Sequence, residues 1–409
     1  MSIKFLFSGM QSESISDSIN FLESKGCWRP FDDRAIAFVN ELSKILLKED
    51  SVKDFPDLIA LAYWFRKSNI NRLRESYKDN DRFYRMGRGL SLHIAPGNVD
   101  TIFVYSFFLS LLAGNTNFIR VSQQESPQLT MLINLFIKLH NSNQFEASSR
   151  FIICTYPHES DVTKVISDRC NMRIIWGGDD TTSFISAIPL KPTAIELKFS
   201  DRSSFSIINL HALKELDLQG LSVLAESFYS DIKMFGQQAC SSPLAVFFVG
   251  DKSVFKEADR FWSKLNEFFS KDKTEAPQIM NRMVSAASMA VSESINSIVD
   301  PMSKDKIMLL NGNLNSRKTF RDGHFGEGLI VQYFISSIHK LPQYIHDKDQ
   351  TLSVFGFQHN DILKFISSLK NRGIDRVVPI GQALDFSHIW DGFDLIDCMS
   401  RKVDITKLR

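Results

Sequence analysis

The feature that most constrains the fold is an alternation, from residue 89 onward, of short apolar stretches with segments of helical periodicity. The strand-like stretches cover residues 90–95, 118–121, 150–155, 172–176, 195–199 and 205–209 in a first series, and 244–249, 328–334, 351–356 and 376–380 in a second. Strands that alternate with helices form a largely parallel sheet with helices on both faces. The sequence therefore predicts an α/β fold with two Rossmann-like parallel-sheet domains.

The chain is long enough for more than one domain. Its 409 residues exceed what one hydrophobic core usually supports, so two principal domains are expected. Apolar residues recur at helical spacing in 35–47 and 58–65, which predicts a helical N-terminal region. The expected parts are this helical region at 1–80, a cofactor-binding α/β domain at 81–212, a catalytic α/β domain at 213–392 and a C-terminal tail at 393–409. The stretch from 272 to 325 is less regular.

Charge and cysteine content exclude several classes of protein. Lys and Arg number 48 and Asp and Glu number 47, so neither a nucleic acid nor an anionic membrane is expected as the main partner. The five cysteines lack metal-ligand spacing, which argues against a disulfide scaffold or a zinc site and favours a reducing compartment. The N-terminus does not resemble a signal peptide, and the most apolar segment, 102–113, is shorter than the ~20 residues of a membrane span. We expect a cytoplasmic protein with no membrane span and no bound metal.

Cys240 is the candidate nucleophile. It lies in a polar turn of small residues, between a helical segment and an apolar strand that Pro243 introduces. A thiol at such a junction can be exposed and close to backbone N–H groups, and these features lower a thiol pKa and favour nucleophilic chemistry. A cysteine taken at random is far more often a small packing residue, as Cys154 inside an apolar strand illustrates.

Two further turns follow predicted strands. Asn98, after Ala95-Pro96-Gly97, can donate a hydrogen bond to a developing oxyanion, although an Asn after Gly is more often only a turn residue. Gly177 and Gly178 stand between a strand and a helix, where a backbone can approach a phosphate. The standard G-x-G-x-x-G fingerprint is absent, and Asp179 and Asp180 would repel a phosphate unless they only cap the helix.

Together these segments resemble the aldehyde dehydrogenase superfamily, and most closely its acyl-CoA reductase (LuxC) branch, over residues 30–397. The matching motifs are His93-Ile-Ala-Pro-Gly-Asn-Val99, Leu112-Ala-Gly-Asn-Thr116, Gly177-Gly-Asp-Asp-Thr181, Gln237-Gln-Ala-Cys-Ser-Ser-Pro243 and Trp390-Asp-Gly392. Their order and spacing also match those of the family. The resemblance implies an aldehyde dehydrogenase-like fold.

The resemblance also implies a role for each matched residue. Cys240 is the nucleophile, and Asn98 forms the oxyanion hole with the backbone N–H of Cys240. Arg120 stands where the superfamily has a Lys that contacts the adenosine ribose. An Arg can hold a 2′-phosphate with two hydrogen bonds, which favours NADPH, and a structural salt bridge is the alternative. The other implied cofactor-binding residues are Ala95, Pro96, Gly97, Ser122, Gly177, Gly178 and Thr181.

The sequence departs from the superfamily in two places. Hydrolytic aldehyde dehydrogenases carry a Glu-Leu-Gly-Gly motif whose Glu activates water, but residues 198–202 have no Glu in register. Glu196 lies two residues upstream, and its role is open. The usual Glu-x-x-Phe-Gly-Pro segment is also missing, and 349–351 is the candidate for its place. Loss of the water-activating base suits an acyl reductase, because hydrolysis would waste a thioester intermediate.

The implied activity is NADPH-dependent reduction of an acyl thioester, on coenzyme A or on a protein, to an aldehyde. The family also implies a fatty acyl substrate, a partner acyl-protein synthetase and a homo-oligomer. Three alternatives stay open. The chain could oxidise aldehydes, or serve as a non-catalytic subunit of an acyl-processing complex. It could also be a cysteine acyltransferase or thioesterase, which needs a His paired with Cys240, and the sequence indicates no nearby His.

Overall fold

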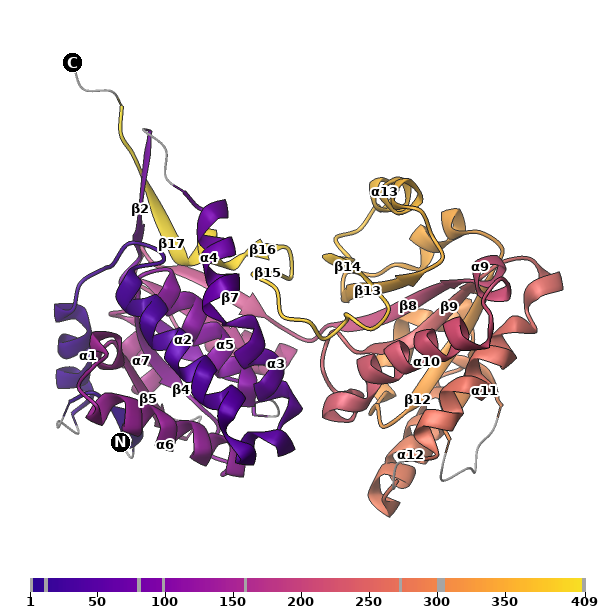
Figure 1. Ribbon diagram of the computed structural model, residues 1–409, viewed down its shortest axis with the longest axis horizontal. Helices are drawn as coiled ribbons and strands as arrows, with labels where there is room; N and C mark the ends of the chain where they lie inside the picture. Colours follow the sequence, from indigo (N-terminus) through magenta and orange to yellow (C-terminus); the bar gives the residue numbers. More distant parts are fainter. Residues whose placement is uncertain are drawn as a thin grey trace. The chain divides into compact units, whose positions relative to one another are not determined.

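The computed structural model describes residues 3–10, 14–78, 82–97, 100–157, 160–271, 274–299 and 306–406. These residues belong to two compact units (Figure 1). Unit 1 comprises Met1–Asp201 and Phe386–Arg409, and unit 2 comprises Arg202–Asp385. Each unit is built around its own twisted sheet, as expected for a chain of this length.

The sheet of unit 1 has the strand order β1-β5-β4-β3-β6-β7. Its strands are β1 (Lys4–Ser8), β3 (Leu90–Ile94), β4 (Thr116–Arg120), β5 (Phe151–Thr155), β6 (Met172–Trp176) and β7 (Ile195–Phe199). All pairs are parallel except β1 with β5. The central strands β3, β4 and β6 are buried along their whole length, including polar side chains such as His93, Asn117 and Arg173.

Helices cover both faces of this sheet. The helices of unit 1 are α1 (Ile15–Ser24), α2 (Asp33–Lys48), α3 (Pro56–Trp64), α4 (Lys67–Ser76), α5 (Asp100–Leu112), α6 (Pro127–Asn141), α7 (Val162–Ser167), α8 (Asp179–Ser186) and α14 (Leu395–Met399). Several begin at a polar N-cap, for example α6, where Ser126 accepts the N–H of Leu129 and Pro127 follows. Phenylalanines fill the core between α2, α5, α6 and the sheet, so the Phe-rich composition is explained by packing.

Two small ribbons complete unit 1. β2 (Phe83–Gly87) pairs antiparallel with β17 (Ser400–Asp404), and β15 (Ile389–Trp390) pairs with β16 (Phe393–Asp394). The ribbon of β2 and β17 joins segments more than three hundred residues apart in sequence (Figure 1). Short 3₁₀ helices cover Asp50–Asp54 and Glu146–Ser149.

The sheet of unit 2 has the order β10-β11-β12-β9-β8-β13-β14, and only β10 is antiparallel to its neighbour. Its strands are β8 (Ser203–Asn209), β9 (Pro243–Val249), β10 (Ile295–Ile298), β11 (Met308–Gly312), β12 (Leu329–Ile335), β13 (Asp349–Phe355) and β14 (Arg376–Pro379). The helices are α9 (Leu210–Lys214), α10 (Leu218–Lys233), α11 (Glu257–Phe269), α12 (Ala276–Val291) and α13 (His359–Ser367). Short 3₁₀ helices are η3 (Met234–Gln237), η4 (Lys252–Val254), η5 (Leu314–Gly323) and η6 (Ile338–Tyr344). Helices α10 and α11 cover one face, and α12 and α13 the other.

The predicted α/β class with two parallel-sheet domains is confirmed. Four details differ from the sequence analysis. The predicted helical N-terminal region contains strand β1, the predicted tail contains strand β17, and the stretch 272–325 contains α12, β10 and β11. The strand at 205–209, expected in the first series, is central in the sheet of unit 2 because it pairs with β9 and β13.

Candidate functional site

The predicted cofactor segments meet at one edge of the unit 1 sheet. β3, β4 and β6 are neighbours, so their carboxyl ends lead side by side into residues 95–97, 121–122 and 177–178. The Ala95 N–H donates to the Arg120 carbonyl over 2.9 Å, which joins two of these ends. In the sheet, β4 lies on one side of β3 and β6, which comes later in the chain, lies on the other side. The crevice between β3 and β6 is therefore a topological switch point, where open α/β sheets bind ligands.

A buried polar network lies beneath this edge. His93 on β3 is hydrogen-bonded through Nδ1 to Ser106 Oγ (2.9 Å) and through Nε2 to Asn117 Oδ1 (3.0 Å). The Trp176 indole N–H also donates to Ser106 Oγ, over 3.1 Å. Burial lowers the pKa of His93 to about 4, so the ring is neutral at physiological pH. The network ties β3, β4 and β6 to helix α5.

The adenosine end of the predicted cofactor site has polar groups at two neighbouring strand ends. Among the residues that the structure describes, a Cβ at Gly97 would meet Ser122 alone, at 3.5 Å from its Oγ. Arg120 is 6% exposed; its Nη2 donates to the Tyr156 carbonyl over 3.4 Å and its Cζ lies 5.7 Å from the Tyr156 ring. Burial lowers the pKa of Arg120. Arg120 and Ser122 thus supply a guanidinium and a hydroxyl, the kinds of group that bind a phosphorylated ribose.

The residues at the pyrophosphate end of the predicted site are less suited to binding a pyrophosphate than the sequence predicted. The Asp179 N–H, at the start of α8, donates to Asp201 Oδ2 over 3.1 Å, and the Asp201 N–H donates back to Asp179 Oδ1 over 3.3 Å. A Cβ at Gly178 would lie 3.2 Å from Asp201 Oδ2, and one at Gly177 would lie 3.1 Å from Thr181 Cγ2. The absence of a side chain at Gly177 and Gly178 therefore allows Thr181 and Asp201 to pack closely against the backbone of this turn. A carboxylate already occupies the helix terminus that a pyrophosphate would approach.

Asn98, the predicted oxyanion donor, lies outside the residues that the structure describes. Its role stays a prediction, as do the roles of the other matched residues.

In unit 2, Cys240 lies on a tightly held loop between η3 and β9. Phe235, Gly236 and Gln237 all have left-handed backbone conformations, with φ values of 56°, 56° and 64°. The buried Gln237 amide donates to the carbonyls of Pro243 (2.8 Å) and Leu329 (3.1 Å), and its Oε1 accepts the Gly328 N–H (2.9 Å). These bonds fasten the loop to the start of β12 and hold two non-glycine residues in a conformation that is costly for them.

A second attachment acts on the cysteine itself. The buried Ser204 hydroxyl donates to the Cys240 carbonyl over 2.7 Å and accepts the Thr351 N–H over 3.0 Å. It thereby links the cysteine to β8 and β13. The Cys240 side chain is half-buried and forms no disulfide. A thiol that is partly accessible on a rigid loop has the geometry of a nucleophile.

The other four cysteines have the environment of packing residues. Cys154 and Cys170 are fully buried, and burial raises the pKa of Cys170 to about 11 and that of Cys154 still further. Burial also raises the pKa of the half-buried Cys27 and Cys398. Raised thiol pKa values suppress the reactive thiolate at neutral pH.

Two carboxylates that the sequence analysis left open are engaged in ion pairs. Glu196 accepts from Arg173 Nε over 2.6 Å and from the Ser186 hydroxyl over 2.8 Å. Asp349 is fully buried and forms a two-bond pair with Arg317, at 2.9 and 3.0 Å. Both carboxylates have structural partners, so neither has the arrangement of a water-activating base or a cofactor-binding group.

One histidine that the sequence did not single out, His324, lies close to the Cys240 loop. His324 Nδ1 accepts the Gly326 N–H over 3.1 Å, and the next carbonyl, of Phe325, accepts from the Gln238 side chain. Glu327 N–H also donates to the Gly236 carbonyl over 2.9 Å. Burial lowers the pKa of His324 to about 4. No local signal links His324 to Cys240, because 84 positions separate them in the sequence.

The described residues contain neither a metal-binding cluster nor a membrane-spanning helix. Within the ranges that the structure describes, no three His, Cys, Asp or Glu side chains are grouped so that they could hold a metal ion. None of the helices in those ranges is both long and apolar enough to cross a membrane.

Comparison with known sequences identifies one family. The family model described as acyl-CoA reductase (LuxC) matches residues 68–402. A long-chain acyl-protein thioester reductase of Aliivibrio fischeri is 24% identical over 302 residues, covering 72% of this chain and 58% of the relative. One from Vibrio harveyi is 25% identical over 305 residues, covering 72% and 59%. The chain thus spans less than two thirds of the length of these relatives.

Solved structures show the same fold. A salicylaldehyde dehydrogenase from Pseudomonas putida G7 aligns over 100% of this chain and 96% of its own, with a TM-score of 0.68 and 14% identity. A methylmalonate-semialdehyde dehydrogenase from Oceanimonas doudoroffii aligns over 98% and 91%, with the same TM-score and identity. The predicted aldehyde dehydrogenase-like fold is therefore confirmed.

Proposed function

Because the chain belongs to the acyl-CoA reductase (LuxC) family, we propose that it reduces an acyl thioester to an aldehyde through a covalent thioester on Cys240. The observation that carries the proposal is the Cys240 loop. Its cysteine is partly accessible, and Gln237 and Ser204 hold it in place through five hydrogen bonds. A packing cysteine needs no such support.

In the proposed reaction, the Cys240 thiolate attacks the acyl carbonyl and the carrier leaves as a thiol. The backbone N–H of Cys240 and the Asn98 amide would stabilise the oxyanion, and loss of one such donor typically costs ~10²–10³ in rate. Bound NADPH would supply a hydride to the acyl carbon. The thiohemiacetal on Cys240 then collapses, releasing the aldehyde and regenerating the thiolate.

We place the adenosine end of NADPH at the carboxyl ends of β3 and β4. Arg120 would bind the 2′-phosphate and Ser122 a ribose hydroxyl, with Ala95, Pro96 and Gly97 forming the adjacent backbone wall. The chemistry of these groups supports this placement. Gly177, Gly178 and Thr181 would flank the pyrophosphate, which would have to approach Asp201.

The residues around the expected position of the water-activating Glu favour a reductase over a hydrolytic dehydrogenase. Lys198 falls in the stretch where those enzymes carry their water-activating Glu, and the nearby Glu196 is held by Arg173. Without a positioned base, an acyl group on Cys240 is protected from hydrolysis long enough to be reduced.

For the substrate, we propose a long-chain acyl group delivered on coenzyme A or on a protein. The relatives are named long-chain acyl-protein thioester reductases, which supports this class. By the same analogy, an acyl-protein synthetase is the proposed partner and a homo-oligomer the proposed assembly, in the cytoplasm.

The test is NADPH consumption with a series of acyl-CoAs, compared between wild type and Cys240→Ala. The matched control is Cys27→Ala, since Cys27 is also half-buried but has a raised thiol pKa. We expect turnover that Cys240→Ala abolishes and Cys27→Ala retains. If no acyl-CoA is turned over, a radiolabelled acyl donor distinguishes two cases. Labelling of Cys240 without NADPH consumption would instead favour an acyltransferase, and no labelling of Cys240 would refute the nucleophile.

A further inference from the structure

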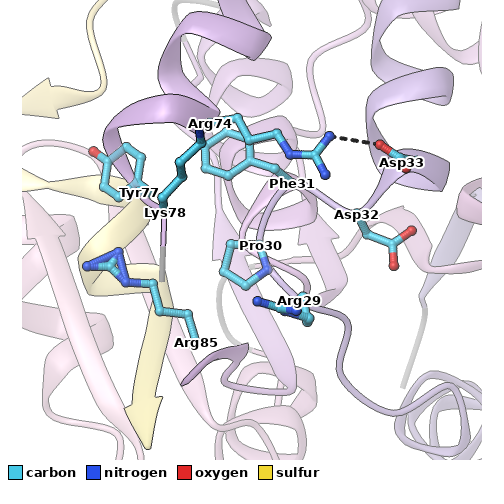
Figure 2. Close-up of a pocket in the computed structure, with 9 residues that line it drawn as sticks. All are labelled: Arg29, Pro30, Phe31, Asp32, Asp33, Arg74, Tyr77, Lys78 and Arg85. Carbon is cyan, nitrogen blue, oxygen red and sulfur yellow. Dashed lines mark hydrogen bonds and ion pairs between the residues drawn. The ribbon is translucent and has the colours of Figure 1, made fainter. Parts of the chain in front are cut away.

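A basic pocket lies in unit 1, at the end of the sheet opposite the proposed cofactor site. Its volume is about 410 Å³, and it is lined by residues before and at the start of α2, at the end of α4 and on β2: Arg29, Pro30, Phe31, Asp32, Asp33, Arg74, Tyr77, Lys78 and Arg85 (Figure 2). The wall containing Phe31 is bonded to the turn before β4, where the Phe31 N–H donates to the Leu112 carbonyl over 2.6 Å. The pocket is thus near the amino end of β4. The proposed cofactor residues follow its carboxyl end, roughly 15 Å away for a five-residue strand.

Four cations and two carboxylates line the pocket, and both carboxylates already have partners. Asp33 accepts from Arg74 over 2.9 Å, and Asp32 accepts from Arg34, which is not part of the lining, also over 2.9 Å. Figure 2 shows Arg74 turned toward Asp33, with Arg29 and Arg85 on the opposite side of Phe31 and Pro30. Asp33 and Asp32 are therefore engaged by Arg74 and Arg34, respectively.

Arg85 presents a hydrogen-bond donor that the described residues do not satisfy. Its Nη2 lies 3.0 Å from Asp397 Oδ1, and its side chain is 16% exposed. Its Nη1 is buried and has no hydrogen-bond partner within the described part of the chain. A buried donor of this kind is costly, and a bound anion would satisfy it.

The other cationic groups come from separate elements. The Arg29 guanidinium lies 4.4 Å from the centre of the Tyr84 ring, a contact that restricts where it can move. Lys78 follows α4, is two-thirds exposed and forms an ion pair with the equally exposed Glu75, a pairing worth little at the surface. Phe31 and Tyr77, with ring centres 5.7 Å apart, give the pocket an apolar wall. With Arg85, these cationic groups come from three segments that line one pocket, and charged donors from several segments suit the oxygens of a phosphate group.

We propose that this pocket binds a phosphate ester of a small molecule, with Arg29, Arg85 and Lys78 holding the phosphate. A volume of about 410 Å³ is within the range of small-molecule sites, and the aromatic wall would cover the rest of the ligand. The site is separate from the one proposed for NADPH, so the two ligands would not compete.

The test is calorimetric titration of the whole protein with inorganic phosphate and with AMP, in chloride at constant ionic strength. We expect saturable binding of both, about tenfold weaker in Arg85→Met, because a hydrogen bond to a charged group is lost. This variant should fold, since Asp397 keeps Lys402 at 2.9 Å. Lys78→Met, at an exposed position, should weaken binding as well. Lys48→Met, an exposed lysine outside the pocket, is the charge-matched control and should bind as wild type does.

Three results would overturn the proposal. The binding of phosphate could fail to reach saturation. Arg85→Met and Lys78→Met could bind phosphate as strongly as wild type does, or NADPH could displace the phosphate. The last result would place the phosphate in the cofactor site. Binding retained by Lys48→Met, weakened by both pocket variants and insensitive to NADPH would establish the site.

Discussion

At the scale of single residues, Gln237 supports the Cys240 loop more than the adjacent Gln238 does. Its amide makes three hydrogen bonds to buried backbone groups, whereas the exposed Gln238 makes one, to Phe325. In Gln237→Met those backbone groups lose their partners, at a cost of about 2–4 kcal/mol. We expect a lower unfolding free energy and at least tenfold slower acylation of Cys240.

Urea unfolding and the rate of acyl labelling measure these two effects. Gln238→Met is the matched control and should change either quantity much less. Equal effects of the two substitutions would mean that Gln237 does not have a special role in positioning the loop.

Asp201 provides a second prediction at this scale, because its charge lies where we place the cofactor pyrophosphate. Asp201→Asn keeps an oxygen that can accept the Asp179 N–H but removes the negative charge. Weaker repulsion should lower the Kd for NADPH about threefold to tenfold. The measurement is NADPH fluorescence, with the exposed Asp180→Asn as control. An unchanged Kd in Asp201→Asn would show that the pyrophosphate does not pass this residue.

At the scale of elements, the contact between β3 and α5 depends on a histidine that must stay neutral. Burial holds the pKa of His93 at about 4, below the value of 6.5 that it would have in the unfolded chain. The unfolded state therefore binds more protons between these values. The stabilisation is complete above pH 6.5 and is lost as the pH falls toward 4.

We expect His93→Gln to reduce this pH dependence, because glutamine can form hydrogen bonds but does not titrate. Urea unfolding at several pH values between 4 and 7 measures the free energy for both proteins. His324 titrates in the same direction and should leave a residual dependence in the variant. A pH profile that the substitution leaves unaltered would contradict the assignment to His93.

The elements also show which parts of the fold can be predicted from sequence. β3 and β6 were predictable because each is a short, mainly apolar run that ends at a glycine-containing turn, which is typical of a buried strand. Helix α12 was missed because its apolar residues are divided between both faces, with Ala286 and Met289 buried and others exposed. Met280, Met283 and Val291 are exposed, while its buried side includes Arg282 and Ser285. Its periodicity therefore does not indicate a buried face.

At the scale of the whole molecule, local motifs predict parts of the site but not the long-range support. The segments at 95–97 and 177–178 were predictable because the ends of parallel strands meet at one edge. Ser204 and the segment 325–327 next to His324 were not, because each contacts the Cys240 loop from a distant strand or loop. Such contacts depend on strand order, which single motifs do not encode. The unfavourable position of Asp201 at α8 likewise depends on the pairing of β6 with β7.

The division of the chain into two units leads to a final prediction, that cofactor affinity and acylation can be changed separately. Arg120 belongs to unit 1, whereas Cys240 and its supports belong to unit 2. Arg120→Lys keeps a positive charge but cannot make two parallel hydrogen bonds to a phosphate. We expect NADPH to bind about tenfold more weakly, NADH to bind unchanged, and acylation of Cys240 to proceed at the wild-type rate.

Fluorescence titration with each nucleotide and acyl labelling without nucleotide measure the three quantities on one variant. Gln237→Met is the complementary variant, which should slow labelling while leaving NADPH affinity intact. Equal losses for NADPH and NADH in Arg120→Lys would assign Arg120 the alternative role of a structural ion-pairing residue. A slower labelling rate in the same variant would mean that the two half-reactions are coupled, because a change confined to the cofactor site would then reach the nucleophile.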